Sequence, residues 1–476
     1  MTSLDKFRKD RRLTASRDGL GGSRGRRAAT GGSSPPQGST ALYKRLPKGP
    51  HGIAREQVVR HQRIRMHGAM VEAVALHGYE GASVRQVVSL AGVSRRAFYE
   101  QFANREACFL ETFDLILART LRRVRSVHDS TEGDPGDRLH AAFAAFLEEL
   151  EENPKAIHLV LVDSLAAGPE GVARLCKALA ALETVLANGW ASPPGSPPPA
   201  RPIARAIVGG LRRATVVRLH EEGARIHAGL AEDLLGWTRV LCAPAAEDLR
   251  VRPSAREPFP ARPQHPDDPE AERSDRMRLM YGALNLTLRD PNGELSVPQI
   301  CDEVDLPIDA FLELFQNPHE CLHAALDMLA GDLLEIVADP DLVSEEWPLA
   351  VCRALERLTT YLAANPERTV SLALSSTVAG IDTLEHVANL DREIATLLTE
   401  GAPCAPLHPI APEGIAGALS HTLYTEAVSD RAHLLPVFVE HHSYVVLAPY
   451  LGPEAAVRAI IENRPGGAAP RAPRDS

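Results

Sequence analysis

The sequence predicts an all-α fold, and three observations support this. Of its 476 residues, 44% are hydrophobic but only 5% are aromatic, so alanine, leucine and valine must fill most of the core. Leu- and Ala-rich segments with few β-branched runs favour helices. Ile64, Gly68, Val71 and Ala75 recur at spacings of four, three and four, which places them on one helix face. At roughly 100–200 residues per domain, the length suggests two to four domains.

The charges are divided unevenly along the chain. Residues 1–50 carry 12 Lys and Arg against three Asp, and residues 51–125 carry 12 against seven acidic residues. The first 125 residues therefore have a net charge of +14, and since the whole chain has −10, the remainder has −24. This asymmetry predicts a basic N-terminal arm on an acidic body.

A helix-turn-helix pattern follows the first predicted helix, which Gly78 should end in the left-handed conformation. Ser83 is a suitable N-cap for the next helix. The apolar residues that follow it at helical spacing are Val84, Val87, Val88 and Ala91. Gly92 can then take the left-handed conformation that ends this helix, and Ser94 can cap a second one. Ala97 and Phe98 should point inward from the second helix, with Phe102 packing beyond its end.

The outward face of the second helix has the chemistry of a DNA recognition helix. Arg95 and Arg96 are of the type that forms bidentate hydrogen bonds to guanine O6 and N7 in the major groove. Hydroxyl groups such as that of Tyr99, and capped helix N-termini, bind phosphate oxygens. The full set of candidate DNA-binding residues is Ser83, Arg85, Gln86, Ser94, Arg95, Arg96, Tyr99 and Arg105.

The stretch 78–109, GYEGASVRQVVSLAGVSRRAFYEQFANREACF, resembles the signature of TetR-family regulators. The matching positions are Ser83, Gly92, Val93, Ser94, Phe98, Tyr99, Phe102 and Arg105, the last where the family usually has Lys. The resemblance implies a three-helix DNA-binding domain followed by a larger helical domain that binds a small ligand and dimerises. It is strong over residues 57–118, whereas residues 119–243 match in length and helicity more than in sequence.

The second half of the sequence repeats the first. At an offset of 213, Ser83 matches Ser296, Phe98 matches Phe311, and Asn104 matches Asn317. The second copy differs where DNA would be touched, because Ile308 and Asp309 replace Arg95 and Arg96 and Leu312 replaces Tyr99. Further replacements are Asp305 for Gly92, Pro307 for Ser94 and Pro318 for Arg105. We therefore predict a tandem duplication whose second copy is degenerate and repels DNA.

The expected organisation has seven segments. They are a disordered basic arm (1–54), a helix-turn-helix domain (55–118), a helical regulatory domain (119–243), a Pro-rich linker (244–271), a degenerate helix-turn-helix domain (272–335), a second regulatory-type domain (336–463) and a disordered tail (464–476). Within the first half, helices are expected near 139–152, 155–166, 171–188 and 203–241, with a proline-rich loop at 191–202.

Other functional classes find little support in the sequence. It has no P-loop, G-x-S-x-G or H-E-x-x-H motif, so we expect no enzyme, cofactor or catalytic residue. His421, His433, His441 and His442 could form a metal site, although solvated or core histidines explain them better. The seven scattered cysteines suggest reduced thiols. Without a long apolar stretch or a signal-peptide pattern, we expect a cytoplasmic protein with no membrane contact. A ligand-binding or protein-interaction module with weak DNA binding remains the alternative.

The resemblance also predicts partners. We expect double-stranded DNA, and a small hydrophobic effector that releases a repressor. The effector would occupy a cavity, or its remnant, in each helical domain, with 157–165 and 370–378 as wall segments. The C-terminal helices of the two halves, near 203–241 and 412–447, should pack as an internal pseudo-dimer. Two such chains would then form a homodimer on a palindromic site.

Overall fold

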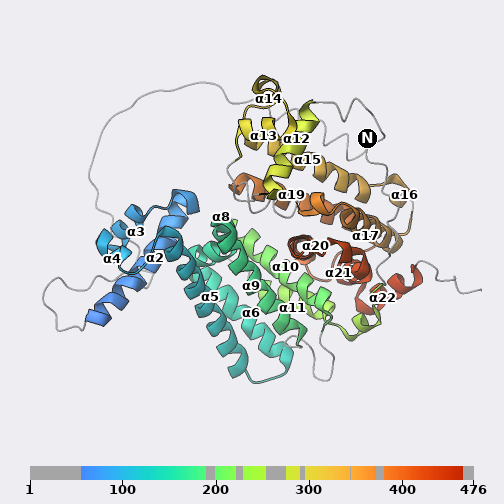
Figure 1. Cartoon of the computed structure of the whole chain (residues 1–476). Helices are drawn as coiled ribbons and strands as arrows, with labels where there is room; N and C mark the ends of the chain where they lie inside the picture. Colours follow the sequence, from blue (N-terminus) through green and yellow to red (C-terminus); the bar gives the residue numbers. More distant parts are fainter. Residues whose placement is uncertain are drawn as a thin grey trace, which may run out of the picture. The chain divides into compact units, whose positions relative to one another are not determined.

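The computed structural model describes residues 55–188, 199–220, 229–252, 275–289, 295–343, 345–370 and 380–464. All secondary structure in these ranges is helical (Figure 1). None of the described helices is both long and apolar enough to cross a membrane. The expected arm (1–54), most of the loop at 191–202, the wall segment at 371–378 and the tail from 465 lie outside these ranges.

Four helices make up the N-terminal domain. They are α2 (Arg55–Gly81), α3 (Val84–Ala91), α4 (Arg95–Tyr99) and α5 (Arg105–Ser130). Gly78 interrupts α2 with a positive φ of 69°, but its ψ of 171° is outside the expected left-handed helical conformation and α2 continues to Gly81. Of the four residues expected to share one face of α2, Gly68 is buried and Val71 is partly buried, whereas Ile64 and Ala75 are exposed. The residues that α2 buries are mainly small or flexible ones: Met66, Ala69, Met70, Ala73 and Val74.

In the rest of the first half, two of the four expected helices are divided into shorter elements. Its elements are α6 (Pro135–Glu152), α7 (Pro154–His158), η1 (Leu159–Asp163), α8 (Ser164–Ala166), α9 (Gly168–Ala187), α10 (Arg201–His220) and α11 (Leu230–Leu241). The predicted single helix at 155–166 contains a π-helical turn, η1, in its middle. The predicted single helix at 203–241 is described as two, α10 and α11.

The start of the predicted linker is not a free segment. Residues 244–248 form a single 3-10 turn, η2 (Pro244–Asp248), and Leu249 is buried. The Arg250 amide donates to a carboxylate oxygen of Glu440 at 2.8 Å, and the Arg252 amide donates to the Val437 carbonyl at 2.9 Å. The linker prediction is therefore wrong for residues 244–252, which pack against the second half of the chain. Residues 253–271 of the predicted linker are outside the described ranges.

The second half begins with a three-helix arrangement like that of the first. Its elements are α12 (Asp275–Arg289), α13 (Val297–Val304), α14 (Ile308–Leu314), α15 (Pro318–Val337), α16 (Pro340–Val343), α17 (Trp347–Ala364), α19 (Gly380–Thr399), α20 (Ala411–Val428), η3 (Ala432–Phe438), α21 (Val439–Leu451) and α22 (Pro453–Glu462). Helix α12 packs against α13, α14 and α15, and α15 packs in turn against α17 and α19.

The buried apolar side chains form two clusters. One contains the N-terminal domain together with η1 and the beginning of α9. The other combines α6, α10 and α11 with the helices of the second half. The turn η1 therefore belongs to the core of the N-terminal domain, while α10 shares a core with the second half.

The most extensive contact between the described helices of the two halves is the crossing of α10 and α20, which Figure 1 shows next to each other. Near the start of α10, Arg205 pairs with Glu426 near the end of α20. Near the end of α10, Arg218 pairs with Glu413 near the start of α20, at 3.3 Å. These two ion pairs establish that α10 and α20 are antiparallel.

Glycines occupy the middle of this crossing. A Cβ atom on Gly209 would lie 2.5 Å from the Cβ of His421, and one on Gly417 would lie 2.5 Å from the Gly209 carbonyl oxygen. A Cβ on Gly210 would lie 2.9 Å from the Gly414 carbonyl oxygen and closer still to the ring of Trp237. Only glycine allows two helix backbones to approach this closely.

Candidate nucleic-acid interface

The capping of α3 fixes the start of the helix-turn-helix. The Ser83 hydroxyl accepts a hydrogen bond from the Gln86 amide, and the Gln86 side-chain oxygen accepts one from the Ser83 amide at 2.6 Å. This reciprocal pair satisfies two backbone donors that the first turn of a helix leaves unpaired. The predicted cap is therefore present. It also engages the side chain of Gln86, for which the sequence predicts only a contact with DNA.

The turn between α3 and α4 is held by glycine geometry and a buried arginine. Gly92 takes φ 59° and ψ 41°, the left-handed conformation expected of it. Arg65 of α2 is only 7% exposed, and its guanidinium donates to the carbonyls of Ala91 and Gly92. The turn is thus bonded to α2, which limits movement of α4 relative to the rest of the domain. Sequence reasoning missed Arg65, since nothing local distinguishes it from the neighbouring surface arginines.

Helix α4 is short but firmly anchored. The Ser94 hydroxyl accepts from the Ala97 amide at 3.0 Å, as a cap should. Phe98 is fully buried and lies 5.3 Å from the ring of Phe102, which is 3% exposed. His67 meets Phe102 edge-on at 5.4 Å, and burial lowers the pKa of this histidine. The inward face of α4 is therefore apolar and aromatic, as predicted.

The opposite face of α4 presents its polar side chains to solvent. Arg95 is exposed and has no side-chain partner among the described residues. The Arg96 side chain is 89% exposed and donates to Glu100 at 2.9 Å, one turn further along. Tyr99 is 51% exposed. Arg85 of α3 is also exposed. The described structure thus brings three arginines and a tyrosine to the surface around one capped turn.

Arg105 has a structural role that the sequence did not predict. Its guanidinium donates to the carbonyls of Tyr79, Glu80 and Ala82 at 2.9, 3.1 and 3.2 Å, and lies 4.3 Å from the centre of the Tyr79 ring. Burial raises the pKa of Tyr79. Arg105 therefore closes the loop between α2 and α3, although 28% of its side chain remains exposed.

Residues 69–112 match the family model of the bacterial regulatory proteins, tetR family. This chain carries a TetR-type helix-turn-helix domain. The match includes both helices of the motif and the first residues of α5, and a domain of this type implies binding to DNA. The TetR-type domain contains all eight candidate residues named from the sequence.

The second half contains a similar motif with a different surface. Ser296 caps α13 in the same reciprocal way with Gln299, and Asp305 takes the left-handed conformation of Gly92, with φ 52° and ψ 55°. On α14, however, Ile308 and Leu312 are 46% and 58% exposed, and Pro307 cannot provide a side-chain cap. The face of α14 that corresponds to the α4 surface is therefore apolar and acidic.

The C-terminal histidines belong mostly to the core. His421, His441 and His442 are 9%, 3% and 6% exposed. His421 lies 2.9 Å from a carboxylate oxygen of Glu183. No group of three or more metal-ligating side chains occurs among the residues that the structure describes.

Proposed function

We propose that the protein is a DNA-binding transcriptional regulator that places α4 in the major groove. The single observation that carries this proposal is the exposed face of α4, which presents Arg95, Arg96 and Tyr99 within a TetR-type domain. A helix held at its N-terminus by Ser94 and underneath by Phe98 is rigid enough to position these side chains.

The individual roles follow from exposure and partners. Arg95, which has no partner in the described structure, is the best candidate for a bidentate contact to guanine. Arg96 must exchange its ion pair with Glu100 for DNA. Ser83 and Ser94 stand at helix N-termini, where backbone amides favour a phosphate. Arg85, Gln86, Tyr99 and the exposed part of Arg105 complete the proposed contacts.

We infer that the second half arose by tandem duplication and no longer binds DNA. Several contacts recur at an offset of 213. Arg65 donates to the Ala91 carbonyl as Arg278 donates to that of Val304. Arg63 lies over the ring of Phe102 at 4.8 Å, and Arg276 over that of Phe315 at 4.5 Å. Asn104 caps α5 as Asn317 caps α15. These pairs support a common origin, whereas the α14 surface lacks any arginine.

We further propose that α10 and α20 form an internal pseudo-dimer. The reciprocal approach of Gly209 and Gly417, and ion pairs at both ends of the crossing, are what an approximate two-fold axis produces. A single chain then offers one recognition helix, so tight binding to a palindrome needs two chains. Crosslinking cysteines placed at Arg218 and Glu413 tests this, since crosslinks that form only between chains would refute it.

The direction of regulation rests on the family resemblance alone. We propose repression that is relieved by a small hydrophobic ligand. The competing function, a ligand- or protein-binding module with weak DNA binding, is favoured by one observation, the exposed apolar and acidic face of α14.

A selection of bound sites from random DNA distinguishes the two functions. A regulator should yield one consensus sequence, and its affinity should fall steeply with salt as phosphate-bound counterions are released. The Arg95→Ala variant should lose preference at one position of the site, whereas Arg276→Ala, in the corresponding domain of the second half, should not. Failure to enrich any sequence would support the alternative function.

A further inference from the structure

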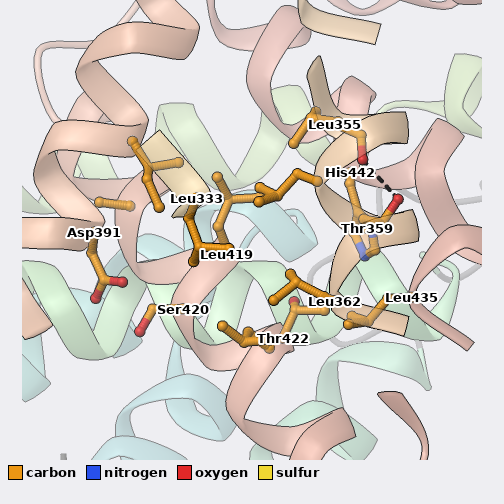
Figure 2. Close-up of a pocket in the computed structure, with 14 residues that line it drawn as sticks. Leu333, Leu355, Thr359, Leu362, Asp391, Leu419, Ser420, Thr422, Leu435 and His442 are labelled. Carbon is orange, nitrogen blue, oxygen red and sulfur yellow. Dashed lines mark hydrogen bonds between the residues drawn. The ribbon is translucent and has the colours of Figure 1, made fainter. Parts of the chain in front are cut away.

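The second half contains a small cavity bordered by α15, α17, α19, α20, η3 and α21 (Figure 2). Its volume is about 60 Å³. Most of its wall is apolar and comes from α15, α17, α19, α20 and η3, through side chains that include Leu333, Leu355, Leu419 and Leu435. Ligand sites for drug-sized molecules have volumes of roughly 300–1,000 Å³. The cavity therefore suits a molecule with only a few carbon atoms.

Polar groups occupy two opposite sides of this cavity. Figure 2 shows Asp391 and Ser420 on one side, and Thr359 and His442 on the other. The Thr359 hydroxyl donates to the Leu355 carbonyl at 2.7 Å, so that group is already satisfied. His442 is different, because its Nε2 atom is buried and has no hydrogen-bond partner among the residues that the structure describes.

The unpaired nitrogen of His442 indicates which ligand chemistry would fit. Burial, together with His441 and Arg205, lowers the pKa of His442 to about 3, so the imidazole is neutral. In a neutral imidazole, Nε2 either carries a proton and donates a hydrogen bond, or lacks the proton and accepts a hydrogen bond. A hydroxyl group both donates and accepts, and can therefore pair with either tautomer. A buried polar atom without a partner is costly, so such a ligand would remove an existing penalty.

The other polar side of the cavity is connected to the first half. Asp391 lines the cavity, accepts a hydrogen bond from Ser420 and lies 3.6 Å from Arg213 of α10. The next residue, Arg212, donates to the carbonyl of Leu161 at 3.3 Å. Leu161 lies in η1, which packs against α2 and α5 of the DNA-binding domain. A continuous series of contacts thus leads from the cavity through α10 to that domain.

We propose that this cavity binds a small, largely apolar molecule with one hydroxyl group, and that its occupancy alters DNA binding through Arg213 and Arg212. The proposal rests on the proposed regulator function for its second part only. Binding to the cavity itself requires no DNA.

Binding is measured first, with 4,4,4-trifluoro-1-butanol as the probe and fluorine NMR of the full chain. We expect saturable binding that unlabelled 1-butanol displaces. The similar molecule 1-chlorobutane, which has no hydroxyl group, should displace the probe at least tenfold less effectively. His442→Phe, which removes Nε2, and Leu419→Phe, which fills the cavity, should each weaken binding at least tenfold. Leu407→Phe is the matched control, because Leu407 is 52% exposed and outside the cavity.

The results separate the proposal from the function on which it rests. Absence of saturable binding to the folded protein, or unchanged binding in both cavity variants, would overturn the site whether or not the protein binds DNA. For the second part, saturating probe should change the Kd for the selected DNA site at least threefold. Arg213→Met should keep probe binding within twofold but remove this change. Probe binding without any effect on DNA affinity would overturn the route through α10.

Discussion

Replacing Gly209 with alanine tests the α10–α20 crossing directly. The added methyl group would lie 2.5 Å from the Cβ of His421 and closer still to the carbonyl oxygen of Gly417. Neither neighbour is the free end of a flexible side chain, so the two helices must separate. Overpacking of this kind costs about 1–3 kcal/mol. Alanine also stabilises a helix interior by about 1 kcal/mol relative to glycine.

Gly331→Ala on α15 is the matched control. Gly331 lies within a helix and an added Cβ would have no atom within 4 Å. The Gly331→Ala variant therefore gains the helix propensity of alanine without a steric clash. The difference between the free energies of unfolding of the two variants isolates the cost of the clash, about 1–3 kcal/mol. Urea unfolding followed by circular dichroism and by tryptophan emission measures both, since Trp237 is fully buried beside the crossing. If Gly209→Ala proved as stabilising as Gly331→Ala, the close approach of these helices would be refuted.

Four further predictions follow from other parts of the chain. Arg95→Ala should weaken binding to the selected site by about 1–3 kcal/mol, measured by fluorescence anisotropy, and unchanged affinity and preference would contradict its assigned contact. Arg65→Met should lower the free energy of unfolding by about 1–3 kcal/mol, because the Ala91 and Gly92 carbonyls lose their donor; a neutral effect in urea titrations would argue against the bonded turn. His442→Leu should resist acid better than the native chain. The buried imidazole stays neutral, whereas the imidazole of the unfolded chain gains a proton below pH 6.5. The free energy of unfolding of the native chain therefore falls relative to that of the variant by roughly 2 kcal/mol at pH 5, and continues to fall toward pH 3. Parallel pH profiles of the two free energies of unfolding would show that His442 titrates normally. Deleting residues 1–50, which have a net charge of +9, should flatten the dependence of log K on log salt without changing the preferred site, and an equal slope would place the arm away from DNA.

The parts of the fold that sequence predicted best are those set by local chemistry. Ser83, Gly92 and Ser94 have the capping roles expected of them, because a cap depends on a few neighbouring residues. The break at Gly78 has the same origin. The inward position of Phe98 was also clear, since a large aromatic side chain has few stable places other than the core.

The parts that were mispredicted depend on distant partners. Ile64 was expected on the same helix face as Gly68, which is buried, but Ile64 is exposed because packing against α3, α5 and η1 determines which residues of α2 are buried. The prolines after Ala243 predict a free linker. The backbone amides of Arg250 and Arg252 nevertheless donate hydrogen bonds to acceptors about 190 residues further along the chain. No local pattern reveals such a pairing. The bonds of Arg65 and Arg105 to loop carbonyls escaped prediction for the same reason.

The crossing of α10 and α20 within one chain has consequences for how this protein can change. In a symmetric dimer each substitution at the interface appears twice, and dilution separates the subunits. Here a substitution appears once, and lowering the protein concentration leaves the crossing intact. The two sides can therefore differ, and they do: the glycines are adjacent on α10, at 209 and 210, but three residues apart on α20, at 414 and 417. In a symmetric dimer a substitution must be tolerated on both sides of the interface, whereas in this chain it needs to be tolerated on only one side.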